Sequence, residues 1–428
     1  MTKETTTEKS IFERRESQVR SYCRSFDTVF TRASGSTLLD EAGNEFTDFL
    51  AGCSSLNYGH NDPDMKAALM EYVAQDGITH ALDMYTGPKA AFLETLERLI
   101  LAPRGMDHRV MMTGPTGTNA VEAAIKLARK VTGRSNVIAF TNGFHGMTLG
   151  ALSLTGNAGK RHGAGVPLGG VTHLPYEGSL GDDVDTLAII ETMLDNTSSG
   201  VDAPAAFVVE LIQGEGGLTA ASRAWIEGIA RLAKRHGAKL IIDDIQAGIG
   251  RSGDFFSFDG MDVEPDMITL AKSLSGYGLP FALTLIKPEL DVWKPAEHNG
   301  TFRGNTHAFV TARVALEKFW SDDSFKAEIA EKAQVLTEGL ERIAAMIPGA
   351  RLKGRGMMQG VDVGSGDLAG AICAEAFARG LVIETSGADD EVVKVLAPLT
   401  TPMAQFKAGL ATLAKAAQAC SAAKIAAE

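Results

Sequence analysis

One lysine stands in a setting that a surface lysine would not need. Lys272 follows the apolar run Met267–Leu270 and precedes a loop rich in glycine and serine, so we expect it at the end of a buried strand. Partial desolvation lowers the pKa of an amine there and leaves a neutral nucleophile that can attack a carbonyl carbon. Taken alone, Lys272 is better explained as a solvated loop lysine.

Two adjacent carboxylates, Asp243 and Asp244, end a second apolar run, Leu240–Ile242. Paired acids at a strand end indicate a metal site, a charged hydrogen-bond partner for a ligand, or a helix cap. Alternation along the strand turns the two side chains to opposite faces. The ring nitrogen of pyridoxal phosphate (PLP) needs one such carboxylate, because a protonated nitrogen makes the ring an electron sink. Asp243 is the residue that we expect in that role.

The segment from Gly248 to Gly253 reads G-I-G-R-S-G and matches a dinucleotide-binding fingerprint after a strand. That fingerprint requires a helix to begin at the glycines. The residues that follow, 254–261, show no helical period and contain a turn. We therefore do not expect a nicotinamide or flavin cofactor here.

An anion site is predicted where the segment Thr116-Gly117-Thr118-Asn119 joins a strand to an amphipathic helix. Free backbone N–H groups and the helix dipole collect negative charge at such a helix start, which suits a phosphate group. An ordinary Thr or Asn helix cap is the alternative.

Three further polar loops could carry chemistry, and two of them follow predicted strands. Phe144 stands between glycines and could stack on a flat heteroaromatic ring, while His145 could hydrogen-bond a neighbouring acid. The loop Glu210–Gly217 places acids and an amide at a strand end, where open α/β sheets hold ligands. His298–Asn305 is another polar loop with glycines. Each of these features could also be an ordinary core residue or turn.

Taken together and in this order, six motifs resemble those of the class III (ω-type) aminotransferases, over nearly the whole chain from Gly52 to Pro398. The motifs are Thr116-Gly117-Thr118, Phe144-His145-Gly146, Glu210 to Gly217, Asp243-x-x-Gln246-x-Gly-x-Gly-Arg, Lys272 and Thr301-Phe-x-Gly-Asn. The resemblance implies PLP as cofactor, PLP fold type I, and a homodimer or dimer of dimers with a shared active site.

The resemblance also implies roles for single residues. Lys272 would carry the cofactor as a Schiff base and act in catalysis with Asp243, which would pair with the pyridine nitrogen. The other cofactor contacts would be Gly117 and Thr118 at the phosphate with the partner subunit's Thr301, Phe144 on the ring, His145 behind Asp243, Ile245 under the ring, Gln246 at the phenolic oxygen, and Glu210.

Within the family, the strings Ala51–Pro63 and Thr79–Thr86 are most similar to the branch that forms 2,4-diaminobutyrate in ectoine biosynthesis. Glutamate would donate the amino group and aspartate β-semialdehyde would accept it, so the partners are small amino acids, keto acids and aldehydes. The alternatives are an ornithine-, acetylornithine- or 4-aminobutyrate-type aminotransferase, a PLP 1,2-aminomutase or decarboxylase, and a non-catalytic binding relative.

One position departs from the family pattern. Many relatives carry an arginine near the C-terminus that binds the substrate carboxylate and pairs with a glutamate matching Glu215, whereas this chain has Lys394. Lysine gives a point charge without the bidentate geometry of arginine. Either Lys394 binds the carboxylate more weakly, or Arg303 or Arg355 takes its place.

The elements that must position these residues follow an α/β pattern. Strands are predicted at 109–112, 137–140, 206–211, 239–243, 267–270 and 282–286, which indicates a mostly parallel, seven-stranded type of sheet covered by helices in residues 63–322. A smaller α+β domain is predicted from residues 1–62 and 323–428, with helices at 325–347 and from 403 and strands within 352–363 and 392–396. Two helices of the large domain are expected from Pro63 to Gly77 and from Asn119 to Lys130.

Composition excludes several classes of protein. The chain has 428 residues, a net charge of −12 and a pI near 5.3, with basic residues scattered along it, so we expect no nucleic-acid partner. Four widely spaced cysteines predict neither disulfides nor a zinc site, and we expect no metal. Without a signal sequence in residues 1–16 or a long apolar run, the protein is expected in the cytoplasm and not in a membrane.

Overall fold

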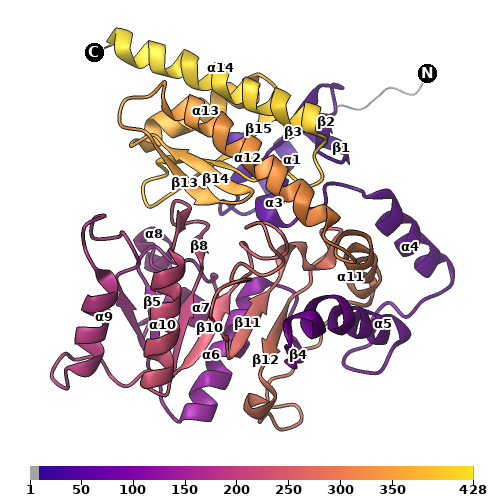
Figure 1. Cartoon of the computed structure of the whole chain (residues 1–428). Coiled ribbons are helices and arrows are strands. Elements are labelled where there is room, and N and C mark those ends of the chain that lie inside the picture. The colour runs from indigo at the N-terminus through magenta and orange to yellow at the C-terminus, as the bar shows by residue number, and fades with distance from the viewer. Residues whose placement is uncertain (1–8, 428) are drawn as a thin grey trace.

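The computed structural model describes residues 9–427 (Figure 1). The expectation about a signal sequence in residues 1–16 therefore falls partly outside the described residues. Its largest sheet has seven strands in the order β4-β12-β11-β10-β7-β5-β6. The bounds of these strands are Arg109–Met112 (β4), Val137–Phe140 (β5), Val171–Leu174 (β6), Ala206–Val209 (β7), Lys239–Asp243 (β10), Met267–Leu270 (β11) and Leu283–Ile286 (β12).

The sheet is mostly parallel, as predicted. β10 pairs in parallel with β7 and β11, and β5 with β6 and β7, whereas β12 runs antiparallel to both of its neighbours. The strands β5, β7, β11 and β12 are buried at every residue, which is why they read as short unbroken apolar runs in the sequence. The carboxyl ends of the parallel strands therefore share one edge.

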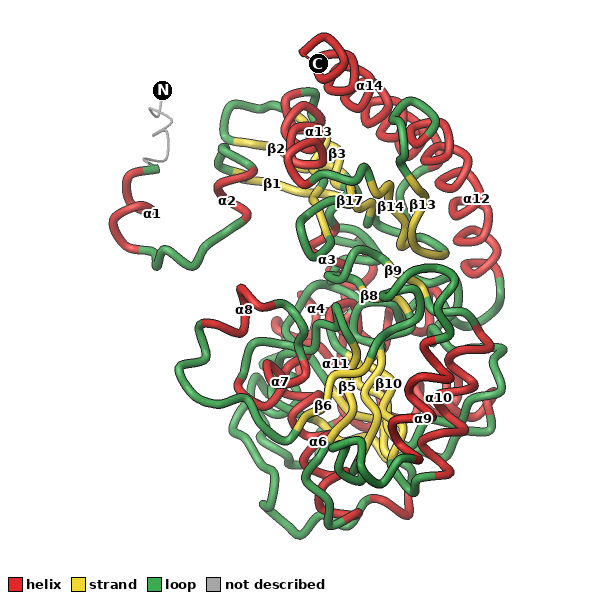
Figure 2. Tube along the Cα trace, turned by 90° about the vertical axis from the view of Figure 1, so that its left-hand side faces the viewer, coloured by secondary structure: helices red, strands yellow, loops and turns green. Residues whose placement is uncertain are grey.

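Helices cover both faces of this sheet (Figure 2): α9 (Thr186–Asp195) and α10 (Arg223–Arg235) lie on one side, α6 (Gly117–Thr132) and α7 (Leu149–Leu154) on the other. α10 buries one stripe of apolar side chains at helical spacing, namely Trp225, Ile226, Ile229 and Leu232. α6 starts with a capping box at Thr116 and ends at Gly133, whose φ of 68° suits glycine.

Three further helices, α4 (Pro63–Ala74), α5 (Gly87–Leu96) and α11 (Thr306–Phe319), pack together beside β4 and β12 (Figure 1). Asp62 caps α4 by accepting hydrogen bonds from the backbone of its first turn, and Pro63 occupies the first helical position. Shorter elements are α1 (Ser10–Arg15), α2 (Tyr22–Ser25), α3 (Ala51–Ser54), α8 (Ala158–His162), β8 (Ile212–Gln213) and β9 (Thr219–Ala220).

The two ends of the chain meet in a smaller α+β region. One sheet has the order β1-β2-β3-β15, from Phe30–Ser34, Thr37–Asp40, Glu45–Asp48 and Leu381–Val382; the other has the order β13-β14-β17-β16, from Arg351–Arg355, Met358–Asp362, Val392–Val395 and Glu384–Ser386. The helices of this region are α12 (Ser324–Ala344), α13 (Gly366–Ala378) and α14 (Met403–Ala427). β3 pairs in parallel with β15, so strands from the two ends of the chain share one sheet.

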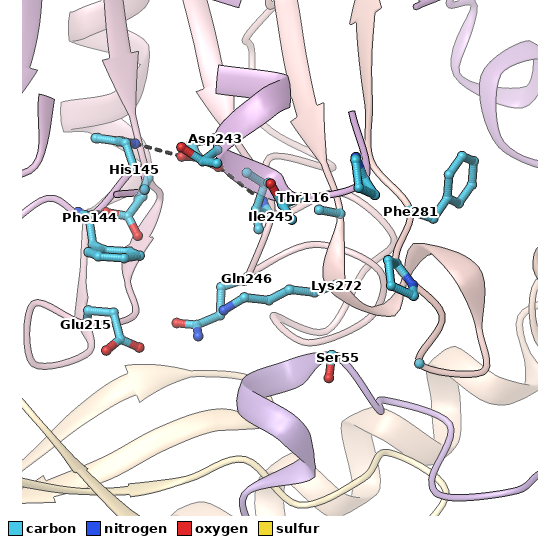
Figure 3. Close-up of a pocket in the computed structure, with 18 of the residues that line it drawn as sticks. Ser55, Thr116, Phe144, His145, Glu215, Asp243, Ile245, Gln246, Lys272 and Phe281 are labelled. Atoms are coloured by element: carbon cyan, nitrogen blue, oxygen red, sulfur yellow. Dashed lines mark hydrogen bonds and ion pairs between the residues drawn. The ribbon is translucent and has the colours of Figure 1, made fainter. Parts of the chain in front are cut away.

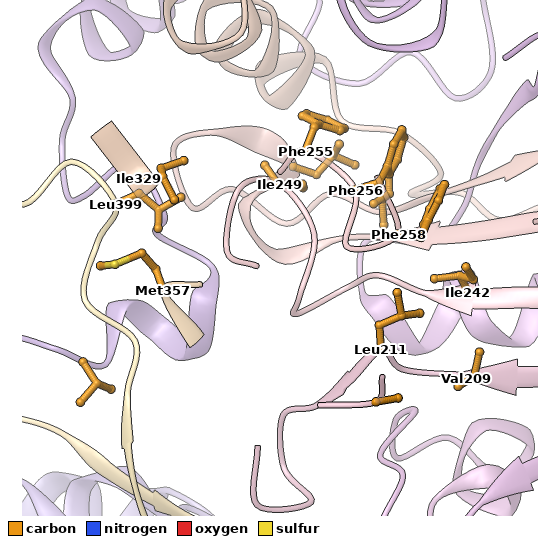
Figure 4. Close-up of a cluster of buried hydrophobic side chains, with 14 of the residues drawn as sticks. Val209, Leu211, Ile242, Ile249, Phe255, Phe256, Phe258, Ile329, Met357 and Leu399 are labelled. Carbon is orange, nitrogen blue, oxygen red and sulfur yellow. The ribbon is translucent and has the colours of Figure 1, made fainter. Parts of the chain in front are cut away.

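A buried apolar cluster joins the two regions (Figure 4). Ile249, Phe255 and Phe256 follow β10 in the large region, and Met357 and Leu399 come from the C-terminal region. Ile249 belongs to the segment 248–253 that resembles a dinucleotide fingerprint, and no helix follows the glycines of this segment, as we expected. Instead, the guanidinium of Arg251 is fully buried and donates hydrogen bonds to Asn57 Oδ1 and to backbone carbonyls, so the segment is structural.

Most predicted strands are found within two residues of their expected bounds, but β6 was not predicted. Its sequence, Val-Thr-His-Leu, is short, and it lies at the edge of the sheet, where fewer apolar residues are needed. The domain boundaries after residues 62 and 322 stay predictions. Among residues 9–427, no helix is long and apolar enough to cross a membrane, and no cluster of His, Cys, Asp or Glu is suited to bind a metal.

Candidate active site

A cavity of about 330 Å³ lies at the carboxyl ends of the parallel strands (Figure 3). Most residues predicted for the cofactor line it, and they come from segments far apart in the sequence. The lining residues of this set are Gly117, Thr118, Phe144, His145, Glu210, Glu215, Asp243, Ile245, Gln246 and Lys272. The fold thus assembles one site from motifs that are individually ambiguous.

Lys272 begins a 3-10 helix, Lys272–Ser275, immediately after β11. Its φ of 50° is uncommon for a residue with a side chain and points to a conformation held in place by the surrounding structure. The side chain is buried, and this burial lowers the pKa of the amine. Within residues 9–427 the amine makes no hydrogen bond or ion pair, so its nitrogen is available to a ligand in the cavity.

Asp243 ends β10 and forms a buried pair with His145, with 2.6 Å between Asp243 Oδ2 and His145 Nδ1 (Figure 3). Thr269 Oγ1 donates a second hydrogen bond to Asp243 Oδ1 at 3.0 Å. Burial by itself would lower the pKa of His145, but the hydrogen bond and charge of Asp243 outweigh it and raise that pKa. The raised pKa of His145 favours a protonated imidazole that donates from Nδ1 to Asp243.

Asp244 lies outside the cavity, as alternation along the strand predicted. Its Oδ2 accepts a hydrogen bond from the backbone N–H of Ser257 at 3.0 Å. Complete burial raises the pKa of Asp244 to about 7. This carboxyl group is part of the core and not of the site.

The start of α6 forms one wall of the cavity. Gly117 and Thr118 are its first two residues, so their backbone N–H groups belong to the turn that has no partners within the helix. A Cβ at Gly117 would lie 2.9 Å from Ile245 Cδ1, which shows how closely the backbone approaches the site floor. This end of the cavity can bind an anion.

Phe144 and Gln246 lie along the other walls. The backbone N–H of Phe144 donates to Glu210 Oε2 at 2.9 Å, and burial raises the pKa of Glu210 to about 7. Gln246 donates from Nε2 to the backbone oxygen of Cys53 at 3.3 Å. Phe144 presents an aromatic ring to the cavity, and the amine of Lys160 lies 4.4 Å from its centroid.

Lys394 lies between two carboxylates. Its Nζ is 3.1 Å from Glu215 Oε1 and 2.8 Å from Glu384 Oε1, and its side chain is 0% exposed. Burial would raise the pKa of Glu215, but Lys394 and Lys272 outweigh it and lower that pKa to about 2. The two glutamates likewise raise the pKa of Lys394 against the effect of burial. The sequence predicted the pairing of Lys394 with Glu215 but not the second carboxylate.

Four predicted residues do not line the cavity of their own chain: Lys394, described above, and Thr301, Arg303 and Arg355. Thr301 is exposed on the loop before α11. Arg303 is in the same loop and contacts Asn299 and Asp83. Arg355, in β13, donates to the backbone oxygen of Ser257 at 2.8 Å and is not a neighbour of Lys272. Among the described residues, Glu215 pairs with Lys394 at 3.1 Å and with Lys160 at 3.9 Å.

Sequence reasoning also missed Tyr22, Cys53 and Lys160, which line a second cavity that shares Phe144, Glu215 and Lys272 with the first. Tyr22 precedes the first recognisable motif and carries no signal of its own, whereas Cys53 lies within the string Ala51–Pro63, which indicated a branch of the family but no role for the thiol. Glu384 could have been found, because it is the register partner of Lys394 in the hairpin of β16 and β17.

The fold and the site, with a buried lysine near a strand end, an acid–histidine pair, an aromatic wall and an anion-binding helix start, are those of a PLP-dependent enzyme. Residues 20–417 match the family Aminotransferase class-III. The chain belongs to this family and is a PLP-dependent aminotransferase.

Similar proteins agree with this family. A diaminobutyrate–2-oxoglutarate transaminase of Halalkalibacterium halodurans is 51% identical over 415 residues, covering 96% of this chain and 97% of that protein. One from Nocardia farcinica is 53% identical over 408 residues, covering 95% of this chain and 94% of that protein. The ornithine aminotransferase of Toxoplasma gondii, whose structure has PLP at partial occupancy in the active site, aligns with a TM-score of 0.82 at 26% identity, over 97% of this chain and 96% of that chain.

The residues of the cavity fit PLP. Lys272 has an unpaired nitrogen for the aldehyde, Asp243 is a carboxylate supported by a histidine, and the start of α6 is suited to the phosphate. A cofactor with these three groups has a complementary partner for each of them along one cavity.

Proposed function

We propose that this aminotransferase moves the amino group of L-glutamate to L-aspartate 4-semialdehyde, giving 2-oxoglutarate and L-2,4-diaminobutyrate, a reaction of ectoine biosynthesis. The observation that carries the proposal is the nearly full-length similarity, at 51% and 53% sequence identity, to two transaminases named for diaminobutyrate and 2-oxoglutarate. The pairing of Lys394 with carboxylates supports it, because the site must serve substrates that differ in charge.

The proposed roles of the residues follow from their positions. Lys272 binds the cofactor and, when released, moves a proton at the carbon that carries the substrate's amino group; its lowered pKa favours the neutral amine that this step needs. Asp243, oriented by His145, keeps the ring nitrogen protonated. PLP supplies the electron sink and the aldehyde that carries the amino group between the two substrates.

The remaining cavity residues are proposed to hold the cofactor in place. Gly117 and Thr118 would bind the phosphate at the start of α6, and Phe144 and Ile245, which both line the cavity, would contact the ring. Gln246 would contact the phenolic oxygen. Glu210 fixes the backbone of Phe144 through the hydrogen bond at 2.9 Å.

We also propose a homodimer, or a dimer of dimers, in which the partner subunit's Thr301 completes the phosphate site. The exposure of Thr301 and its neighbour Phe302, which is 64% exposed, supports this arrangement. Leu82 and Met84 are also exposed, and together with Phe302 they line a separate pocket on the surface. The four cysteines are free thiols, in keeping with the proposed cytoplasmic location.

Product analysis tests the proposed reaction. The purified holoenzyme is incubated with glutamate and, in separate reactions, aspartate semialdehyde, succinate semialdehyde, glutamate semialdehyde and N-acetylglutamate semialdehyde. We expect aspartate semialdehyde to give the highest kcat/KM, with equal amounts of 2,4-diaminobutyrate and 2-oxoglutarate formed. A higher kcat/KM with one of the other aldehydes would refute the proposed acceptor.

A further inference from the structure

The cavity at Lys272 continues into a second lobe, which we call the distal lobe. It is lined by Tyr22, Cys53, Lys160, Glu215 and Glu384, together with Phe144 and Lys272. Lys394 does not line this lobe and its side chain is 0% exposed, whereas Glu215 and Glu384, which both contact its amine, do line the lobe. A substrate that extends from Lys272 therefore meets carboxylates before it meets the lysine.

Charges of both signs line the distal lobe. Lys394 is shared by Glu215 and Glu384, at 3.1 Å and 2.8 Å, and Glu215 also pairs with Lys160, so among the described residues Lys394 is the one ion-pair partner of Glu384. Lys160 and Arg24 also line the distal lobe, as does Asp390. Lys160 lies 3.9 Å from Glu215, and Arg24 donates to neutral oxygens of Gln18 and Arg20. The cation closest to Glu384 is thus Lys394, which it shares with Glu215.

Glu384 is held in place but retains capacity to accept hydrogen bonds. Cys53 Sγ lies 3.7 Å from Glu384 Oε2 and 2.8 Å from the hydroxyl of Tyr22. Glu384 Oε1 is buried and lies 2.8 Å from Lys394 Nζ, whereas the Glu384 side chain as a whole is 12% exposed and lines the lobe. A carboxylate offers about four acceptor sites, so an ammonium group from the cavity can still be bound.

We propose that Glu384 selects the diamino acid by accepting a hydrogen bond from the α-ammonium of 2,4-diaminobutyrate while the γ-amine lies at Lys272. The inference rests on the proposed function and adds the residue that recognises the product, 2,4-diaminobutyrate. Glutamate brings a carboxylate to the distal lobe and no second ammonium, so it gains nothing from Glu384. 4-Aminobutyrate is diaminobutyrate without the α-ammonium, and it isolates this one contact.

The test compares single turnovers of the wild type and of Glu384→Gln with diaminobutyrate, 4-aminobutyrate and glutamate, following the loss of the yellow colour of the holoenzyme. Glutamine keeps the size of the side chain and removes its charge. We expect the rate constant divided by the half-saturation concentration to fall about ten- to a hundredfold for diaminobutyrate, the range of a charge-assisted hydrogen bond. For 4-aminobutyrate it should change less than about threefold, because that substrate makes no such bond.

Asp390→Asn is the matched control, because Asp390 lines the same lobe without contacting Lys394. Its φ of 57° is tolerated by asparagine, and the amide oxygen can still accept from Thr385 Oγ1. We expect the preference for diaminobutyrate over 4-aminobutyrate to be unchanged in this variant. If Glu384→Gln lowers the rate constant divided by the half-saturation concentration equally for both substrates, or for neither, the inference is overturned while the proposed function stands. A wild type that reacts with glutamate but not with diaminobutyrate overturns both.

Discussion

Removing the charge of Lys394 should destabilise the protein strongly. In Lys394→Met the side chain keeps much of its volume, but Glu215 and Glu384, which contact the amine at 3.1 Å and 2.8 Å, lose their shared cation. Removing one partner of a buried ion pair costs about 3–5 kcal/mol. Because the Glu215 side chain is 30% exposed and the Glu384 side chain 12%, we expect the lower end of that range, about 3 kcal/mol.

The loss should depend on pH. Lys394 and Lys272 lower the folded-state pKa of Glu215 from 4.5 to about 2, so this stabilisation is present above pH 4.5 and is lost as the pH falls toward 2. The difference between the wild type and Lys394→Met should therefore be largest above pH 4.5 and decrease below it.

A double variant shows whether charge imbalance causes the loss. We expect the double variant Lys394→Met with Glu384→Gln to regain at least half of the lost stability, since only one carboxylate is then left without a cation. Glu384→Gln alone should have a small effect, because the ion pair between Lys394 and Glu215 remains. Urea unfolding at equal protein concentration with excess PLP measures the series. Additive losses in the double variant, or wild-type stability of Lys394→Met, would contradict this reasoning.

Three further predictions concern other parts of the site. Asp243→Asn should retain PLP but lose at least about a hundredfold in kcat, because an amide cannot keep the ring nitrogen protonated; wild-type turnover would exclude this role. The raised pKa of Asp244, about 7, means that its protonated form stabilises the wild type fully below pH 3.8 and that this stabilisation is lost as the pH rises through 7. Asp244→Asn has no such loss, so its stability relative to the wild type should rise with pH. Urea midpoints at pH 5 and 8 measure that shift, and a constant difference would contradict it. Thr301→Ala should weaken the affinity for PLP, measured by fluorescence titration, by about fivefold or more if the partner subunit's Thr301 donates to the phosphate, and an unchanged affinity would remove it from the site.

The sequence predicted the sheet and its ligand-binding edge well because both depend on local patterns. Buried strands such as β5 and β11 are unbroken apolar runs, and the residues that follow them carry the chemistry. The bounds of α6 were also predictable, because local residues mark both ends: Thr116 caps its start and Gly133 follows its last residue. The edge strand β6 was missed because its mixed sequence has no such pattern.

The distal lobe was harder to predict because its residues are joined only by tertiary structure. Cys53 and Glu384 are 331 positions apart, yet Cys53 Sγ and Glu384 Oε2 lie 3.7 Å apart in the site. The resemblance to the family directed attention to Lys394 as a replacement for arginine, and it says nothing of the carboxylate on the neighbouring strand. The register of β16 and β17 places Glu384 opposite Lys394, so the exchange of arginine for lysine has to be judged together with this second acid. A lysine shared by two glutamates is suited to a substrate end that carries an ammonium, whereas an arginine paired with one glutamate is suited to a carboxylate.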